Sequence, residues 1–442
     1  MRPTFVAQKD IKQVTDGLEA FYQKCLESEE FNADNMLEFM EPIFKSAGYR
    51  QPAVGSNQIN ILLIHDAGVG DFIMMSAALR ELRRIYPNAH ITLMIRQPAN
   101  PIAEHCPYVD EILINISPRD WREFPQVYQR NQKMATELLS RRYDMAFAFT
   151  HYPSTPLLAY MSGARERISH HFDEQNEAFE IGPLFAFEPL VTLEANKWIY
   201  GTHSIESSLA LLTAVTHAPI INREAEVWYT AGDYAATAEF FRLYMDPNRK
   251  VYALCMGGMS YRKMYPPEKY ARLVQLIVEQ EPDINFVILG AGPVDVEAAT
   301  KFKQSLDEEF VKDHVFDLTN AGTYRMSAVM LSFCDMYIGN DTGTMHMAAT
   351  VKTPVLSPSC FATDLDVRYN VLDIYYPYHV PSVTVLVRNA LPECKETRNG
   401  VGCVIEERPH CITQIEPETM YAAYEMLKDR IAQNIIEPLF VS

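Results

Sequence analysis

Long apolar runs are missing from this sequence. The longest ones, INILLIH at 59–65 and VYALCMGGM at 251–259, are far shorter than the roughly 20 residues that span a bilayer. The opening residues, MRPTFVAQKDIKQVTDG, also lack the apolar centre of a secretory signal. These two absences predict a cytoplasmic protein with no transmembrane segment.

Positive charge is scarce as well. Lysine and arginine together number 39, against 57 aspartates and glutamates, which leaves a formal net charge of −18. Non-specific binding to nucleic acid or to an anionic bilayer needs a basic surface. The charge balance therefore removes nucleic acid from the expected partners, although a local basic patch stays open.

Paired cysteine motifs are a third absence. The eight cysteines form no C-x-x-C pair, which argues against a zinc knuckle. Four of them gather in the last quarter of the chain: Cys360, Cys394, Cys403 and Cys411. Reduced thiols are the default in a cytoplasmic chain. A structural iron or zinc ion on these four cysteines is kept only as an alternative.

Strand–helix alternation is what the sequence does have, over the length of two domains. A chain of 442 residues is too long for one ordinary core. We expect a helical extension at 1–56, an α/β domain at 57–230, a second at 231–415, and a final helix at 416–442 that packs back toward the first domain. Both domains have the pattern of doubly wound sheets, which bind ligands at the carboxyl ends of their strands. Part of the first domain, 165–230, is irregular in pattern and suggests long loops.

The first motif at a strand end is HDAGVGDF, residues 65–72. Its glycines, Gly68 and Gly70, let the backbone turn tightly and approach a ligand. Asp71 stands where the N-cap of the next helix is expected, so it could serve a ligand or only cap the helix. The spacing is not G-x-G-x-x-G, which argues against a dinucleotide fingerprint.

The second motif, GGMSYRKMYPPEKY at 257–270, follows the first strand of the second domain. It places Gly258, Arg262 and Lys263 in the loop between that strand and a helix. Cations at this position can neutralise phosphate charge. They can equally be solvated loop residues, and the motif alone leaves both interpretations open.

The third motif is ILGAGPVDVE, residues 288–297. A strand ends at Gly290 in a turn of small residues, and Asp295 and Glu297 follow. The two carboxylates could bind ribose hydroxyls. Acidic residues at this position are also common as helix N-terminal charges, which is the alternative interpretation.

The fourth motif is IGNDTGTMHMAA, residues 338–349. Asp341, Thr342, Gly343 and Thr344 lie at the expected start of a helix, where backbone N–H groups and the helix dipole attract a diphosphate. His346 follows in the first turn. It could donate to a phosphate oxygen or be packed on the helix face.

Together these motifs resemble glycosyltransferase family 9, the heptosyltransferases that build the inner core of lipopolysaccharide. The resemblance covers roughly residues 57–425 and is most specific at IGNDTGTMHMAA and at ILLIHDAGVGDFIMMSAALRELRRIYPNAHI. RKMYPPEKYARL resembles the Lys-Arg-Trp-Pro segment of the family, and CVIEERPHCITQIEPETM its cysteine-rich segment. The resemblance implies an α/β protein of the GT-B fold: two Rossmann-like domains that face an interdomain cleft, with the donor bound by the second.

The resemblance also implies roles for particular residues. Asp71 would be the general base and Lys263 would act with it, in an inverting transfer that needs no metal or other cofactor. The segments 290–297 and 324–326 would surround the nucleoside. The implied donor-binding residues are Gly70, Gly258, Arg262, Gly290, Glu297, Met326, Asp341, Thr342, Gly343, Thr344 and His346. ADP-heptose is the favoured nucleoside-diphosphate sugar.

Three departures from the family pattern leave the acceptor open. The extension at 1–56 is additional, the middle region does not align with the family and carries over no acceptor-binding residues, and the acidic balance fits poorly with docking on anionic lipid A. Within the segment that resembles Lys-Arg-Trp-Pro, Met264 and Tyr265 replace the usual Arg-Trp. The acceptor could be a lipopolysaccharide core, another glycan, lipid-linked or not, or a protein, as in the autotransporter heptosyltransferases. Peripheral contact with the inner membrane stays open. A GT-B-like sugar-nucleotide epimerase is the alternative enzyme.

Overall fold

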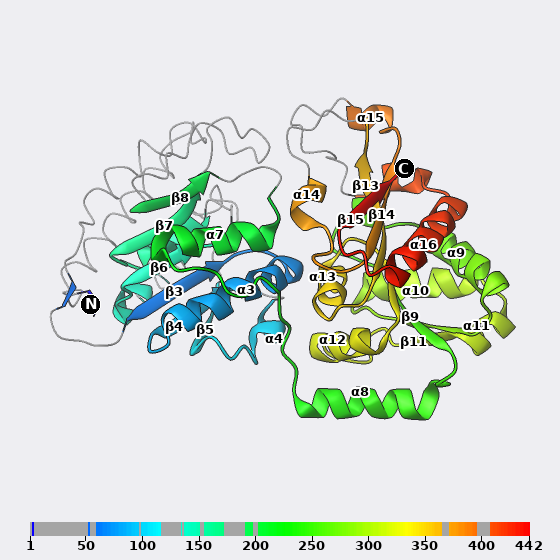
Figure 1. Cartoon of the computed structure of the whole chain (residues 1–442), viewed down its shortest axis with the longest axis horizontal. Coiled ribbons are helices and arrows are strands. Elements are labelled where there is room, and N and C mark those ends of the chain that lie inside the picture. The colour runs from blue at the N-terminus through cyan, green and yellow to red at the C-terminus, as the bar shows by residue number, and fades with distance from the viewer. Residues whose placement is uncertain are drawn as a thin grey trace, which may run out of the picture. The chain divides into compact units, whose positions relative to one another are not determined.

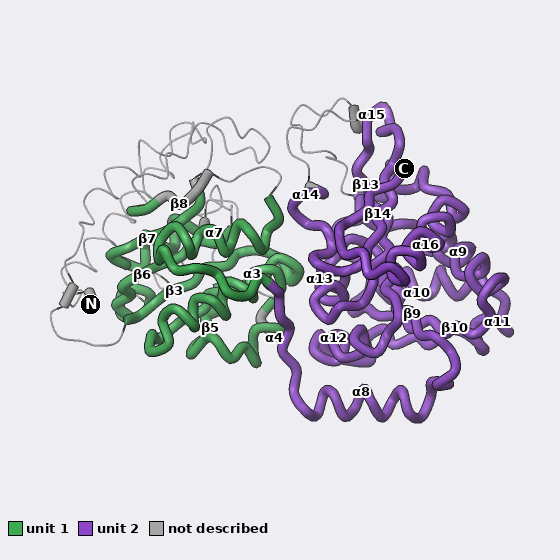
Figure 2. Tube along the Cα trace, in the orientation of Figure 1, with its two compact units in different colours: residues 1–223 green, residues 224–442 purple. Residues whose placement is uncertain are grey.

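The chain folds as two compact units, Met1–Arg223 and Glu224–Ser442 (Figure 2). The domain boundary expected at 230/231 falls just before α8 (Ala231–Tyr244), within the second unit. This computed structural model describes residues 2–3, 52–53, 59–96, 99–115, 134, 137–150, 154–171, 191–197, 202–364, 371–395 and 407–442 (Figure 1). The helical extension expected at 1–56 lies outside the described residues, apart from β1 (Arg2–Pro3) and β2 (Pro52–Ala53), which pair antiparallel.

The first unit is built on a parallel sheet with the strand order β5-β4-β3-β6-β7-β8. The strands are β3 (Asn60–His65), β4 (His90–Ile95), β5 (Glu111–Ile114), β6 (Met145–Ala148), β7 (Glu166–His171) and β8 (Leu193–Lys197). Every residue of β3 is buried because β4 and β6 flank it on both edges and helices cover the sheet. The order reverses between β3 and β6, which is the switch point of a doubly wound sheet.

Three described helices lie between these strands: α3 (Val69–Ile85), α4 (Asn100–Ala103) and α6 (Ser154–Met161); α7 (Ser204–Thr216) follows β8. The apolar stripe of α3 includes Phe72, Met75 and Leu79, all at most 1% exposed, and α3 packs against α7 (Figure 1). The expectation of long loops over 165–230 holds only in part: β7, β8 and α7 lie in this stretch, whereas residues 217–230 form a loop with no helix or strand. The polar sequence of β7, ERISHH, concealed a strand that pairs on both sides.

The second unit repeats the plan with one strand more, in the order β11-β10-β9-β12-β13-β14-β15. The strands are β9 (Lys250–Cys255), β10 (Ile284–Ile288), β11 (Val315–Asp317), β12 (Met336–Gly339), β13 (Val355–Ala362), β14 (Ser382–Val387) and β15 (Pro438–Val441). All of the pairs are parallel. The switch point lies between β9 and β12. The predicted fold class, α/β with two parallel sheets, is confirmed.

Besides α8, the described helices of this unit are α9 (Pro267–Gln280), α10 (Pro293–Gln304), α11 (Glu308–His314), α12 (Tyr324–Phe333), α13 (Gly343–Thr350), α14 (Val371–Tyr375), α15 (Pro392–Lys395) and α16 (Pro417–Ala432), with short 3-10 turns η4 (Tyr261–Lys263) and η5 (Cys411–Gln414). Proline at the first position of α9, α10 and α16 costs no hydrogen bond, because that N–H has no intrahelical partner. Among the described helices, none is both long and apolar enough to cross a bilayer.

The C-terminal segment packs within the second unit. α16 lies against α9, β13 and β14, and β15 extends that unit's sheet. The reason is the apolar face of α16, where Met420, Tyr424 and Leu427 are fully buried in the second core. This face is already covered within its own unit. The expected packing of residues 416–442 toward the first domain stays a prediction.

Candidate active site

The turn after β3 brings Asp71 to the carboxyl edge of the first sheet. Gly68 is the N-cap of α3 and Asp71 is its third helical residue, three positions later than the sequence suggested. The N–H of Gly68 donates to Oδ2 of Asp71 at 3.1 Å, so the carboxylate closes the turn on itself. A Cβ on Gly68 would lie 3.3 Å from that oxygen, a tight contact. Gly70 lies inside the first turn of α3, in the first unit, whereas the other expected donor residues lie in the second.

A buried ion pair stands beside this turn, and the sequence reasoning missed it. Asp66 follows β3 directly and is 0% exposed, while Arg96 follows β4 directly. The Arg96 guanidinium pairs with both carboxylate oxygens of Asp66, through Nε and, at 2.9 Å, through Nη2. A planar bidentate pair of this kind holds both side chains in one orientation. The available signal was the placement of both residues one position past adjacent parallel strands.

In the second unit, Asn340 joins the two loops of the switch point. Its side chain is 0% exposed and its Nδ2 donates to the carbonyls of Met256 at 2.6 Å and Gly257 at 3.1 Å. Its Oδ1 accepts from the N–H of Tyr265 at 3.0 Å and from the hydroxyl of Tyr270 at 2.9 Å. All the hydrogen-bonding positions of one amide are used, so the loop after β9 is fixed against the loop after β12. No role was expected for Asn340 from the sequence, although it lies within the motif IGNDTGTMHMAA.

Lys263 lies against the loop after β12. Its Nζ donates to Oδ2 of Asp341 at 2.7 Å, and Nε2 of His346 lies 3.9 Å from Oδ1 of the same carboxylate. Burial disfavours charge on Lys263, but the adjacent Asp341 carboxylate outweighs it and raises the pKa of the ammonium. Burial also opposes charge on Asp341, yet Lys263 and His346 lower the pKa of its carboxyl. The structure thus brings together a lysine, an aspartate and a histidine that the sequence separates by up to 83 positions, from 263 to 346.

The N-terminus of α13 supplies backbone donors at the same place. Within the described residues, the N-cap Thr342 makes no side-chain cap hydrogen bond, so the first N–H groups, including those of Gly343 and Thr344, are not taken by a cap. His346 is 7% exposed and stands one turn further along. Gly258 lets the preceding loop approach: a Cβ there would lie 3.3 Å from Cγ2 of Thr342. Helix N-termini of this kind bind anions.

At the turn after β10, Asp295 lies closer to the strand edge than Glu297, the residue that the resemblance implied. A Cβ on Gly257 would lie 2.1 Å, and one on Gly290 2.5 Å, from Oδ1 of Asp295, so both glycines make room for that carboxylate. Burial raises the pKa of Asp295. Glu297 has a side chain that is 63% exposed and pairs with Lys301 one turn along α10 at 2.7 Å. The structure therefore places Asp295 at the strand edge and Glu297 on the solvent side of the helix.

Two further expected residues lie at neighbouring loop ends. Met326 is in the first turn of α12, where its N–H donates to the N-cap Thr323 at 3.3 Å, and it packs beside Gly322. Arg262 lies next to Lys263 in η4, half-buried, and its charge contributes to lowering the pKa of Asp341. The expected roles of both residues in donor binding stay predictions.

The four C-terminal cysteines are only partly described. Cys360 and Cys411 are buried, and Sγ of Cys411 accepts from the N–H of Leu391 at 3.4 Å. Cys403 and the side chain of Cys394 lie outside the described residues. Among the side chains that the structure describes, His, Cys, Asp and Glu form no group of three suited to a metal. The alternative of an iron or zinc ion therefore stays a prediction.

The protein has two parallel, doubly wound sheets, and polar and charged side chains stand on the loops at both switch points. This is the α/β architecture of the GT-B heptosyltransferases. Solved structures agree on the fold: the ADP-heptose heptosyltransferase II of Escherichia coli has a TM-score of 0.57 at 17% identity, covering 85% of this chain and 100% of that one. The glycosyl transferase family 9 structure from Veillonella parvula has a TM-score of 0.61 at 17% identity, covering 85% and 98%.

The chain belongs to glycosyltransferase family 9 (heptosyltransferase), whose sequence model matches residues 132–361, just over half of its length. It is therefore a glycosyltransferase, and the family resemblance drawn from the motifs is confirmed. Lipopolysaccharide heptosyltransferase 2 of E. coli K12 is 21% identical over 329 residues, 73% of this chain and 90% of the relative. Lipooligosaccharide heptosyltransferase 2 of Haemophilus influenzae is 22% identical over 311 residues, 68% and 82%.

Proposed function

We propose that this glycosyltransferase moves a heptose, or a related sugar, from an ADP-sugar to a hydroxyl of a glycan acceptor, with inversion at the anomeric carbon and without a metal. The observation that carries the proposal is the group of donors at the switch point of the second unit. Lys263 and the N-terminus of α13 meet there on loops joined by the buried Asn340. A solved relative, an E. coli heptosyltransferase in complex with ADP, supports the choice of nucleotide.

Residues at neighbouring strand ends would bind different parts of the donor nucleotide. Thr342, Gly343 and Thr344 offer backbone N–H groups to the diphosphate, and His346 donates from the next turn. An ammonium has three donors and Asp341 accepts one of them, so Lys263 can bind a phosphate oxygen without losing its partner. Gly290 and Asp295 border the ribose, with Met326 beside the base.

Asp71 takes the proton of the acceptor hydroxyl. As that O–H loses its proton to the carboxylate, the oxygen bonds to the anomeric carbon from the face opposite the diphosphate, and the bond from that carbon to the diphosphate oxygen breaks. One displacement of this kind inverts the configuration. The departing charge needs fixed donors and a cation, which α13 and Lys263 supply in place of a divalent ion.

A protein acceptor is the second candidate. It is favoured by the formal net charge of −18, since an acidic surface is repelled by the anionic headgroups of lipid A. A protein substrate does not require docking on a charged bilayer. Both candidate functions use the same donor site in the second unit. They differ only in the acceptor molecule that the first unit would bind.

Calorimetry and product analysis test the proposal. We expect ADP to bind more tightly than GDP or UDP, and ADP-heptose with a heptose-free lipopolysaccharide core to yield the elongated core and ADP in equal amounts. Elongation of a protein but not of the core would select the second candidate. Release of a rearranged sugar nucleotide with no acceptor present would instead indicate an epimerase, and absence of binding to all three diphosphates would reject the donor site.

A further inference from the structure

The loop that carries Lys263 is long for a connection between a strand and a helix. It has eleven residues, Met256 to Pro266, between the end of β9 and the start of α9. Connections of this kind usually have about 2–6 residues. Met259, near its middle, is 85% exposed. A longer loop has more conformations open to it, so the place of Lys263 depends on the contacts that hold the loop.

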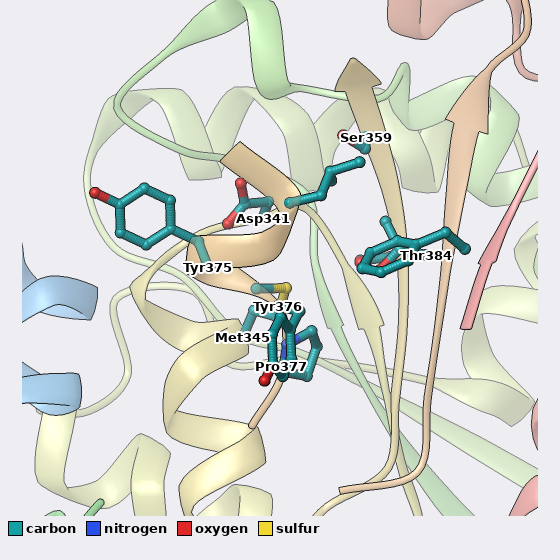
Figure 3. A pocket seen from close by; sticks show the side chains of 10 residues that line it. Asp341, Met345, Ser359, Tyr375, Tyr376, Pro377 and Thr384 are labelled. Carbon is teal, nitrogen blue, oxygen red and sulfur yellow. The ribbon is translucent and has the colours of Figure 1, made fainter. Parts of the chain in front are cut away.

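The ion pair between Lys263 and Asp341 does not fix the loop by itself. Their side chains are 27% and 19% exposed. Asp341 also lies at the edge of a small hollow, together with Met345, Ser359 and Tyr375 (Figure 3). A lysine ammonium stands on a flexible four-carbon stem. Because the stem is flexible and space adjoins the carboxylate, the place of the ammonium depends on where the backbone of Lys263 is held.

Tyr265, two positions after Lys263, holds the end of this loop. Its side chain is 0% exposed, and its N–H donates to Oδ1 of Asn340 at 3.0 Å. Its hydroxyl donates to the carbonyl of Ile415 at 3.1 Å. Burial raises the pKa of this hydroxyl, which therefore stays protonated and remains a donor at neutral pH. One residue thus ties the loop to two distant segments, one after β12 and one before α16.

The carbonyl of Ile415 is itself held in place. Ile415 is buried in the core of the second unit and stands between η5 and α16. Nζ of Lys269 donates to this carbonyl at 3.0 Å and to that of Thr413 at 2.8 Å, and it pairs with Glu416 at 3.0 Å. A carbonyl oxygen has two acceptor positions, and Tyr265 and Lys269 fill both. The hydroxyl of Tyr265 is therefore bound to a fixed point.

The ring of Tyr265 is held as well. It meets Tyr270 edge to face, with ring centroids 4.9 Å apart and 90° between the planes, which is a stabilising geometry for an aromatic pair. The hydroxyl of Tyr270 in turn donates to Asn340 at 2.9 Å. The N–H, the ring and the hydroxyl of Tyr265 all have defined partners. The residue can therefore pass a fixed position on to the backbone of Lys263.

We propose that Tyr265 is a positioning residue for Lys263: by joining the loop to Ile415, it sets the ammonium where the donor diphosphate meets the N-terminus of α13. This assignment rests on the proposed function, because it takes Lys263 to bind that diphosphate. The side chain of Tyr265 is fully buried, so it acts on the ligand only through Lys263. A misplacement of about 1 Å is enough to weaken such an interaction measurably.

The test is a double-mutant cycle on ADP binding, measured by calorimetry on the full-length protein. Tyr265→Phe keeps the ring and removes only the hydroxyl, and it should weaken ADP binding about 3- to 10-fold. Lys263→Ala should weaken ADP binding about 10- to 100-fold. The double variant should bind ADP as weakly as Lys263→Ala alone, because no ammonium is left to position.

Tyr424→Phe is the matched control. Tyr424 is a fully buried tyrosine of the same unit, and its hydroxyl donates to Glu281 at 3.0 Å, a residue with no proposed part in donor binding. Urea denaturation should show a lower unfolding midpoint for both phenylalanine variants. ADP affinity should fall only in Tyr265→Phe, which separates positioning from a general loss of stability.

The outcomes separate the two proposals. Unchanged ADP affinity in Tyr265→Phe would overturn the positioning role alone. The same fold loss with and without Lys263 would do so too, since Tyr265 would then act independently of the lysine. An equal loss in Tyr424→Phe would assign the effect to the stability of the unit and also overturn the role. Failure of wild type to bind ADP would overturn the proposed function, and the positioning role with it.

Discussion

The two units share a strand order. They differ in the hydrogen bonds that hold the loops at their switch points. In the first, Asp71 folds back on the N–H of Gly68, so the turn before α3 satisfies itself. In the second, Asn340 fixes the loops from behind, and the N-terminus of α13 has no side-chain cap among the described residues. The same architecture thus presents a carboxylate in one unit and backbone donors in the other.

Among the described residues, neither N-cap residue, Gly68 of α3 or Thr342 of α13, makes a side-chain cap hydrogen bond, so the two turns differ in the side chains that they hold and not in capping. In the first unit, the Asp71 carboxylate is held in place by the N–H of Gly68. A helix whose cap is missing leaves its N–H groups for an external anion. Asn340 fixes the loop after β9 against the loop after β12, and its side chain takes none of the N–H groups of α13.

Replacement of Asp71 tests the first half of this comparison and should have the largest effect. Asp71→Asn keeps an oxygen for the N–H of Gly68 but cannot accept a proton, so we expect turnover to fall about 10²- to 10⁴-fold with ADP affinity unchanged. Steady-state kinetics and calorimetry measure the two. The control is Asp233→Asn, since Asp233 holds the equivalent capping position of α8 and should leave turnover nearly intact. Full turnover by Asp71→Asn would reduce Asp71 to a cap.

Asn340→Ala tests the second half. It leaves two carbonyls, an N–H and a tyrosine hydroxyl unpaired in a buried place, so we expect a loss on the order of 3–4 kcal/mol in the free energy of unfolding. Urea denaturation followed by circular dichroism measures it. A loss below about 1 kcal/mol would mean that water or a loop shift replaces the amide.

Lys263→Ala should weaken ADP binding about 10- to 100-fold, because it removes a charge-assisted hydrogen bond to phosphate and leaves Asp341 to repel the ligand. Calorimetry gives the affinity directly. Lys352→Ala is the matched control, since that lysine also pairs with a carboxylate of the second unit, Glu224. Equal affinities for both variants would remove Lys263 from the donor site.

Lowering the pH should reduce the stability of the first unit before that of the second. This effect should be the smallest and most gradual of those predicted here. Burial lowers the pKa of His170 in the first unit to about 4 from 6.5, so its contribution to stability is present above pH 6.5 and is lost as the pH falls toward 4. By pH 5 the loss should be about 2 kcal/mol. We expect a domain-resolved hydrogen-exchange experiment to show the first unit weakening below pH 6.5, and His170→Gln to flatten that dependence.

The second unit responds at lower pH. Burial alone would raise the pKa of Glu281, but hydrogen bonds from Lys428, Lys250 and Tyr424 lower it to about 2 from 4.5. Its contribution is therefore present above pH 4.5 and is lost as the pH falls through 2. Simultaneous weakening of both units at pH 6 would contradict the assignment of these two groups.

Local pattern predicted much of this protein. The continuous apolar run of β3, the stripe of α3 and the small-residue turn before α13 each depend on neighbours within a few positions, so periodicity was enough to locate them. The same holds for the position of Lys263 in a strand-to-helix loop. Where the local pattern was polar, as in β7, it failed, because pairing with β6 and β8 decided the conformation there.

The sequence by itself determined the strand ends and the residue types that stand at them: an aspartate after two glycines, a lysine loop, and a small-residue turn before a helix. Only the tertiary structure decided which of these side chains meet. It set Asp295 rather than Glu297 at the strand edge, buried Asp66 against Arg96, and made Asn340 the residue that joins two loops. Parallel strand pairing brings residues about 80 positions apart to one edge, and that proximity cannot be read from local periodicity.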